Sequence, residues 1–242
     1  MNEIVASAKA LHAGQLVAFP TETVYGLGAD AENEKAVARI YEAKGRPADH
    51  PLIVHIASKD QISEWATTVP KYAVELADTY WPGPMTLILE RSQIAKDFVT
   101  GGQDSVGLRV PNHPVALELL KEFMKLGGRG VAAPSANRFG KVSPTTAKAV
   151  QDELGSYLEP GDVILDGGNS DVGIESTIID CRAASPKVLR PGAITVEMIE
   201  QATGLTLDKS GSNLRVSGTL ENHYAPAARV VLDEQALPGD GF

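Results

Sequence analysis

The sequence predicts an α/β (α+β) domain in which helices flank a twisted mixed β-sheet. Short apolar runs with the length of buried strands alternate with segments whose apolar residues recur every three or four positions, the spacing of one helix face. The alternation is irregular, and some strands lie close enough to be joined as hairpins. Both observations argue against a regular βαβ repeat and favour a sheet of mixed direction.

The overall composition fits a globular protein. The chain has 242 residues, of which 43% are hydrophobic, enough for one sizeable domain or one domain with a short appendage. Cys181 is the only cysteine, so an intramolecular disulfide and a cysteine-rich zinc site are both excluded. We expect a cytoplasmic location, because the N-terminus lacks a signal-peptide pattern and no apolar stretch is long enough for a membrane span.

The charge balance bears on the class of ligand. The formal net charge is −9, so the chain lacks a global basic field for nucleic acid. Contact with RNA would need a local basic patch, and clusters of Lys and Arg are sparse in the sequence. The charge therefore favours an enzyme that acts on small molecules.

Five segments have the helical spacing of apolar residues. Gly14 ends the first, while the second has Asn33 as its N-cap and Gly45 as its stop. The third is broken by Trp81-Pro82-Gly83-Pro84. We therefore expect helices over 3–13, between Asn33 and Gly45, and over 70–80, 113–124 and 194–202.

Apolar runs that are too short for helices are expected to form buried strands. The first run, Leu16-Val17-Ala18-Phe19, ends at Pro20, and the last two runs follow each other closely enough to form a strand pair. The expected strands cover 16–19, 52–56, 85–89, 106–110, 131–133, 163–165, 176–181 and 187–189.

The composition changes after Leu205. Residues 208–222 are polar and contain several Gly and Ser residues, which is typical of a linker or a mobile loop. We therefore expect a catalytic domain over 1–205 and a linker or tail over 206–242.

The strongest local pattern is Pro20-Thr21-Glu22-Thr23-Val24-Tyr25-Gly26-Leu27-Gly28, directly after a buried strand. Hydroxyl, carboxylate and phenol groups gather there at a strand end, where open α/β sheets tend to bind ligands. The same residues also suit a well-capped turn whose glycines take positive φ. The pattern by itself leaves both interpretations open.

A phosphate site would need a less common binding motif, because neither a Walker-type motif nor Gly-x-Gly-x-x-Gly is present. In Lys44-Gly45-Arg46-Pro47, two cations one residue apart can both face a polyphosphate. They can equally complement the dipole of the preceding helix, an effect of roughly 0.3–1 kcal/mol each.

Several further polar residues end strands or begin helices. Ser135 and Asn137 lie in a tight turn after an expected strand and suit either a ligand site or a side-chain hydrogen bond within the turn. Ser143 or Thr145 suits the N-cap of a helix. Arg190 follows a strand and is as compatible with a solvated surface as with a ligand site.

The five histidines form no metal-binding pattern. His55 lies inside an apolar strand, where a core histidine is the common explanation. No Gly-x-Ser-x-Gly elbow is present, so a hydrolase triad has no support.

Taken together, these motifs resemble those of the threonylcarbamoyl-AMP synthase family, the YrdC-like enzymes. Each motif is modest alone, but their ordered combination is specific, and the resemblance covers roughly residues 5–200. The matching segments are Pro20-Thr21-Glu22-Thr23-Val24-Tyr25-Gly26-Leu27-Gly28, Lys44-Gly45-Arg46-Pro47, Pro51-Leu52-Ile53-Val54-His55, Trp81-Pro82-Gly83-Pro84, Ala133-Pro134-Ser135-Ala136-Asn137, Glu175-Ser176-Thr177 and Leu189-Arg190-Pro191-Gly192.

The resemblance implies a YrdC-like fold with a concave active-site cleft, and a reaction. The family condenses L-threonine, bicarbonate and Mg²⁺-bound ATP into threonylcarbamoyl-AMP and pyrophosphate. A tRNA threonylcarbamoyl transferase machinery then uses this product to modify an adenosine next to the anticodon. By this resemblance the chain is a nucleotidyltransferase that needs no membrane.

The resemblance also implies roles for individual residues. Lys44 and Arg46 would be catalytic, because they neutralise the triphosphate as pyrophosphate leaves. Arg109 would hold the threonine carboxylate as a bidentate fork. The implied threonine-binding residues are Thr21, His55, Arg109 and Ser176. The implied ATP-binding residues are Lys44, Arg46, Ser105, Ser135, Asn137, Ser143, Arg190 and Tyr224, with no metal ligand because Mg²⁺ is carried by ATP.

The segment His223-Tyr224-Ala225-Pro226 resembles the linker of the family's longer branch, which folds over the active site and joins a second, smaller domain. The contact between Tyr224 and ATP rests on this part of the resemblance. Since the chain ends at Phe242, we expect that second domain to be essentially missing.

Two other functions stay open at this level. The YrdC-like fold is associated with a concave basic surface for double-stranded RNA, so the second hypothesis is a non-catalytic module with weak RNA binding. The negative net charge and the lack of interleaved aromatic and basic residues argue against it. The third is a carbamoyl-transfer relative that uses a carbamoyl-adenylate, although such relatives are usually much larger chains.

Overall fold

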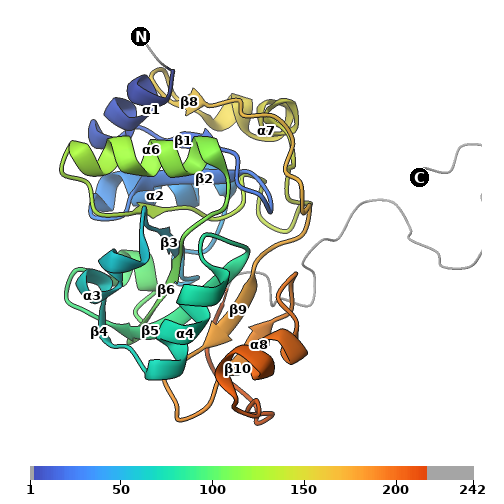
Figure 1. The fold of residues 1–242 in the computed structure, drawn as a ribbon. Coiled ribbons are helices and arrows are strands. Elements are labelled where there is room, and N and C mark those ends of the chain that lie inside the picture. Colours follow the sequence, from blue (N-terminus) through green and yellow to red (C-terminus); the bar gives the residue numbers. More distant parts are fainter. Residues whose placement is uncertain (1–2, 217–242) are drawn as a thin grey trace, which may run out of the picture.

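Ten strands form one mixed sheet within residues 3–216, the part of the chain that the computed structural model describes (Figure 1). The spatial order is β10-β9-β5-β6-β3-β7-β2-β1-β8, and β4 pairs with β5 beside this path. The strands are β1 Val17–Phe19, β2 Gly26–Asp30, β3 Ile53–His55, β4 Ala66–Thr68, β5 Met85–Arg91, β6 Ser105–Arg109, β7 Val131–Ala132, β8 Val163–Ile164, β9 Thr177–Asp180 and β10 Lys187–Arg190.

Strand pairs of both directions occur, as the irregular alternation of elements predicts. β1 and β2 form an antiparallel hairpin, as do β9 and β10. The pairs β3–β6, β5–β9 and β1–β8 are parallel. The described helices are α1 Glu3–His12, α2 Glu34–Lys44, α3 Ile62–Trp65, α4 Lys71–Tyr80, α5 Asp97–Thr100, α6 Pro114–Lys125, α7 Ala147–Leu154 and α8 Val196–Thr203, with single 3₁₀ turns at Lys59–Gln61 and Gly155–Tyr157.

The sheet is buried on both faces where helices cover it. Strand β1 illustrates this, because its side chains enter two different apolar clusters. Val17 and Phe19 belong to a cluster with α1 and α6, which pack against each other, whereas Ala18 between them belongs to the larger core. Since successive side chains in a strand point to opposite faces, the two clusters lie on opposite sides of the sheet. Strands buried on both faces read as continuous apolar runs, which is why the sequence showed them.

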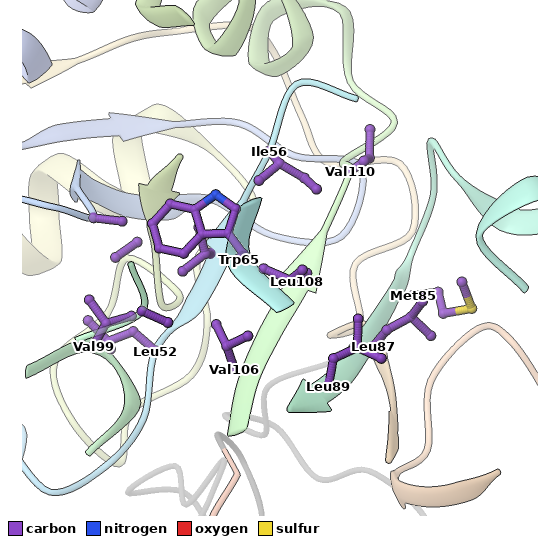
Figure 2. Packing of buried hydrophobic residues seen from close by; sticks show 14 of the residues in the cluster. Leu52, Ile56, Trp65, Met85, Leu87, Leu89, Val99, Val106, Leu108 and Val110 are labelled. Carbon is purple, nitrogen blue, oxygen red and sulfur yellow. The ribbon is translucent and has the colours of Figure 1, made fainter. Parts of the chain in front are cut away.

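The larger core contains residues from α2, α3, α4, α7 and α8. In Figure 2 the indole of Trp65 lies next to Leu108 of β6 and between Ile56 and Leu52, while the labelled side chains of β5 lie farther away. Trp65 is fully buried, and its Nε1 donates a hydrogen bond to the backbone carbonyl of Arg129. The polar atom of this large side chain is therefore satisfied inside the core.

The local signals for α2 are confirmed in atomic detail. The side chain of Asn33 accepts a hydrogen bond from the backbone N–H of Ala36, and Gly45 takes the left-handed conformation after the last turn. The cap predicted for α7 is wrong: Thr146, rather than Ser143 or Thr145, accepts from Ala149. β2 was also missed, because its glycines favour the interpretation as a turn.

Among the described residues, none of the helices combines the length and apolar character that crossing a bilayer requires. The expected tail over 206–242 is described only as far as residue 216. Residues 205–216 contain neither a helix nor a strand.

Gly28→Ala tests how tightly β2 packs. A Cβ at Gly28 would lie 2.7 Å from Cγ1 of Val131 and 2.8 Å from Cε1 of Phe19. We expect the substitution to lower the free energy of unfolding by about 1–3 kcal/mol, the usual cost of overpacking a core. Urea denaturation measures the loss. Gly211→Ala is the control, since its Cβ would meet open space, and equal stability of both variants would contradict this packing.

Candidate active site

Polar residues of the central strands gather on one face of the sheet. Val54 and Leu108 point into the larger core, so His55 and Arg109, the next residues on β3 and β6, point to the opposite face. His55 and Arg109 are also direct partners in the parallel register of these strands. The register therefore places an imidazole and a guanidinium side by side.

A cavity opens over this face, with an empty volume of about 490 Å³ when the open solvent at its mouth is included. Small residues leave the space: a Cβ at Gly26 would lie 3.3 Å from the Cβ of Ala133. We call it the central cavity, and its lining consists of Thr21, Thr23, Val24, Gly26, Arg46, Ile53, His55, Arg109, Ala133, Pro134, Ser135, Glu175, Ser176 and Arg190.

The guanidinium of Arg109 contacts neighbouring side chains through Nη2, whereas its Nε donor points to no protein acceptor among the described residues. Its Nη2 lies 2.8 Å from Oε1 of Glu22 and donates a 2.9 Å hydrogen bond to Oγ1 of Thr23. Its buried Nε has no hydrogen-bond partner among the described residues. A buried donor without a partner is costly, so this N–H is suited to a ligand acceptor.

His55 offers a second unsatisfied atom in the same cavity. The side chain is 4% exposed, and its Nδ1 has no partner among the described residues. Burial, and next the positive charge of Arg109, lower the pKa of His55 to about 3. The imidazole is therefore neutral at physiological pH. Its Nδ1 can donate or accept a hydrogen bond with a ligand, and the ring brings no positive charge to the cavity.

A network of polar groups from the segments at β9 and β10 forms another wall of the cavity. Arg190 forms a buried ion pair with Glu175, and its Nη2 donates to Oγ of Ser176 at 3.0 Å. Ser143 in turn donates to Oε1 of Glu175 at 2.9 Å. The Oγ of Ser176 also lies 2.8 Å from Oγ1 of Thr86 on β5. These contacts fix the start of β9 against the end of β10.

A second hollow adjoins this wall, and we call it the side pocket. Its empty volume is about 1090 Å³. It shares Val24, Glu175 and Arg190 with the central cavity. Exposed apolar side chains, Val142 at 57% and Ile174 at 52%, lie on its rim. Its full lining is Val24, Val142, Ser143, Gly173, Ile174, Glu175, Arg190, Pro191 and Gly192.

Lys44 lies in the wall rather than on the surface of the central cavity. It is 2% exposed, and its Nζ donates to the backbone carbonyls of Ser135 and Asn137. Burial, followed by the charge of Arg46, lowers the pKa of Lys44 to about 7. The side chain of Asn137 donates to two further carbonyls of its own loop. Lys44 thus fixes the loop that presents Ser135.

The fold brings most of the predicted site residues together. The central cavity is lined by Thr21, Arg46, His55, Arg109, Ser135, Ser176 and Arg190. Ser143 lines the side pocket, and Ser105 lines a smaller cavity with Arg215 and Val216 that shares Ile53 with the central one. Lys44 and Asn137 are buried beside the cavity, and Tyr224 lies outside the described residues.

Three side chains of this site were not singled out from the sequence. Glu22 and Glu175 neutralise buried arginines, and Thr23 positions one of them. All three lie in motifs that the sequence displays, but their partners are distant in the chain. Only the fold shows which arginine each carboxylate meets.

The site geometry can be compared with known proteins. The family model Sua5_yciO_yrdC, described as "Telomere recombination", matches residues 9–192. The chain belongs to the Sua5/YciO/YrdC family. A second model, described as "Threonylcarbamoyl-AMP synthase, C-terminal domain", matches residues 194–239.

Two of the curated proteins that are similar to this chain are named threonylcarbamoyl-AMP synthase. The Pyrococcus abyssi protein is 47% identical over 227 residues, which are 91% of this chain and 65% of the relative. The Bacillus subtilis protein is 44% identical over 238 residues, 96% of this chain and 67% of the relative. The chain thus spans about two thirds of the length of these relatives.

Solved structures of the family confirm the predicted fold class. Pyrococcus abyssi Sua5 complexed with L-threonine has a TM-score of 0.85 at 45% identity, and the match covers 93% of this chain and 66% of that one. Escherichia coli YciO has a TM-score of 0.71 at 23% identity, and the match covers 81% of this chain and 92% of YciO. At this identity the likeness supports the fold alone.

The pH dependence of stability tests the burial of Lys44. Because its folded pKa of about 7 lies below the unfolded value of about 10.4, the unfolded chain binds more protons between these limits. Stability due to Lys44 therefore rises with pH across this window. We expect the difference in unfolding free energy between the wild type and Lys44→Met to shift in favour of the wild type from pH 7 to pH 10, as measured by urea denaturation.

Lys209→Met, at an exposed position, is the control variant. A difference between the wild type and Lys44→Met that stays constant with pH would contradict the depressed pKa.

Proposed function

We propose that the chain is an L-threonylcarbamoyladenylate synthase. It condenses L-threonine, bicarbonate and ATP into threonylcarbamoyl-AMP and pyrophosphate, as a nucleotidyltransferase. The observation that carries the proposal is a pair of buried atoms in the central cavity, Nε of Arg109 and Nδ1 of His55, that have no hydrogen-bond partner within residues 3–216. Relatives named threonylcarbamoyl-AMP synthase, and the relative solved with L-threonine, support it.

An α-amino acid satisfies both atoms. The Nε of Arg109 donates to the carboxylate, and a charge-assisted bond of this kind is stronger than a neutral one. The neutral His55 meets a hydroxyl or the amine without charge repulsion. Thr21 and Ser176 also line the cavity and add hydroxyl groups to this polar site.

The nucleotide occupies the side pocket and the edge of the central cavity. The apolar surface of Val142 and Ile174 suits the adenine ring, while Ser143 and Arg190 reach the sugar and the α-phosphate. Arg46 lines the central cavity and faces the triphosphate. Lys44 supports the same phosphates through the Ser135–Asn137 loop that it holds.

Magnesium enters with ATP and neutralises phosphate charge. Among the described residues, no three His, Cys, Asp or Glu side chains cluster into a metal site. We therefore expect phosphate oxygens and water to supply most of its ligands. The Oδ1 of Asn137 is a buried oxygen without a partner in the described part of the chain, and an oxygen of this type fits Mg²⁺. Ser105 and Tyr224 stay predicted nucleotide contacts.

The chemistry needs positioning and charge stabilisation more than acid–base catalysis. The neutral amine of threonine attacks the carbon of bicarbonate, with loss of water, or of CO₂, with loss of a proton, and a carbamate forms. A carbamate oxygen then attacks the α-phosphate, and the bond from the α-phosphate to pyrophosphate breaks. Arg46 and Arg190 face the region where negative charge shifts to the leaving group. A water-poor cavity protects the labile carbamate and adenylate.

The product is a reactive group carrier, so a second activity must consume it. We propose that a tRNA threonylcarbamoyl transferase machinery does so next to the anticodon, in the cytoplasm. The non-catalytic RNA-binding hypothesis is not favoured, since three curated relatives are named threonylcarbamoyl-AMP synthase and the chain carries a net charge of −9. Weak RNA binding stays a prediction.

Product analysis tests the proposal. The chain is incubated with ATP, Mg²⁺, L-threonine and ¹⁴C-bicarbonate, and pyrophosphate and labelled nucleotide are measured. We expect pyrophosphate release that needs both threonine and bicarbonate, with the label in an adenylate. Omission of each substrate is the control. Release that does not depend on threonine, or no release at all, would overturn the assignment.

A further inference from the structure

Glu22 is a buried carboxylate that does not line the central cavity but contacts a residue that does. It is 5% exposed, and Arg109, its ion-pair partner, is 4% exposed. The other carboxylate oxygen, Oε2, accepts the backbone N–H of Asn112 at 2.9 Å. The backbone carbonyl of Glu22 accepts the N–H of Val172 at 2.8 Å. Glu22 thus ties three loops together directly behind the guanidinium.

The contacts of Arg109 set its orientation. Nη2 donates a hydrogen bond to Thr23, and Oε1 of Glu22 lies 2.8 Å from the same nitrogen as an ion-pair contact without hydrogen-bond geometry, so two groups hold this end of the guanidinium. Thr23 is itself held, because its Oγ1 lies 2.8 Å from Oγ1 of Thr21. With Nη2 fixed in this way, the Nε edge is held in one direction, and Nε is the atom without a partner among the described residues.

The same contact sets the charge that a ligand meets. A buried arginine without a counter-ion attracts any small anion, because its charge is poorly screened away from water. With Glu22 beside it, the pair Arg109–Glu22 has no net charge. A ligand is then selected by the direction of the Nε–H donor rather than by charge alone.

We propose that Glu22 is a positioning and specificity residue for the amino-acid substrate, and acts through Arg109. It aims the guanidinium at the substrate carboxylate, and it cancels the guanidinium charge so that inorganic anions do not compete with a zwitterionic amino acid. The inference rests on the threonine binding that the proposed function includes, and it adds a role for a residue that does not touch the substrate.

Glu22→Gln removes the negative charge of the side chain while nearly keeping its shape, so it separates the effect of the charge from the effect of packing. Glutamine has nearly the same size, and its oxygen can still accept the N–H of Asn112. We expect the KM for threonine to rise about tenfold with kcat changed by less than about threefold, because the oriented ion pair is lost while the reacting groups stay. We also expect chloride to become a competitive inhibitor against threonine, with an inhibition constant about tenfold below that of the wild type.

Two further variants sharpen the test. Glu22→Asp keeps the negative charge but shortens the reach, so the KM for threonine should rise while resistance to chloride is kept. It also covers the case in which Glu22→Gln fails to fold. Glu32→Gln is the matched control, because Glu32 pairs with Arg129 through two contacts of 2.9 and 2.8 Å on the outer surface. It should change neither constant.

A purely structural role gives a different result. If Glu22→Gln lowers thermal stability and kcat but leaves chloride inhibition as in the wild type, the inference is wrong. Unchanged KM and unchanged chloride inhibition would overturn it as well.

Calorimetric titration of L-threonine, with and without chloride, separates this inference from the synthase proposal. If the wild type binds threonine without forming product, and Glu22→Gln weakens binding more in chloride, the inference holds and the synthase proposal fails. If the wild type forms product and both proteins bind threonine equally in chloride, only the inference fails. A wild-type chain that binds no threonine contradicts both.

Discussion

The two-residue period of the β-strand is the constraint on which the site depends. Along β3 and β6, every second side chain must enter the core that α2 and α4 cover, which sends the residues between them to the other face. At the margin of that face, α1 and α6 cover the strands with an apolar cluster. At its centre the strands carry glycine, alanine and polar side chains, so a cavity forms there instead of a second packed layer.

Burying polar groups in this cavity costs free energy, and partner groups elsewhere in the chain offset this cost for most of them. Isolated burial of an ion costs several kcal/mol, and the partner carboxylates Glu22 and Glu175 offset that cost for Arg109 and Arg190. Lys44 is compensated by two backbone carbonyls, and burial still lowers its pKa. Two cavity atoms without a partner in the described part of the chain, Nε of Arg109 and Nδ1 of His55, are therefore informative, because they mark where a ligand completes the hydrogen bonding.

The sequence predicted the fold class, the strands buried on both faces and the caps of α2, because each depends on local patterns such as Asn33 and Gly45. It also placed Arg109 and His55 on strands, although only the parallel register puts them side by side. The carboxylate partners could not be predicted, since Glu22 meets a residue 87 positions away, a separation that no local pattern reports. For Lys44, the motif indicated a phosphate contact, and the fold shows a side chain that holds a loop.

The most direct test of the account is a crystal structure of this chain with L-threonine bound. The account predicts threonine in the central cavity, with a carboxylate oxygen within about 3 Å of Nε of Arg109 and a polar atom of the ligand at a similar distance from Nδ1 of His55. Threonine bound in another place, or a central cavity in which both atoms keep their present surroundings at saturating threonine, would contradict it.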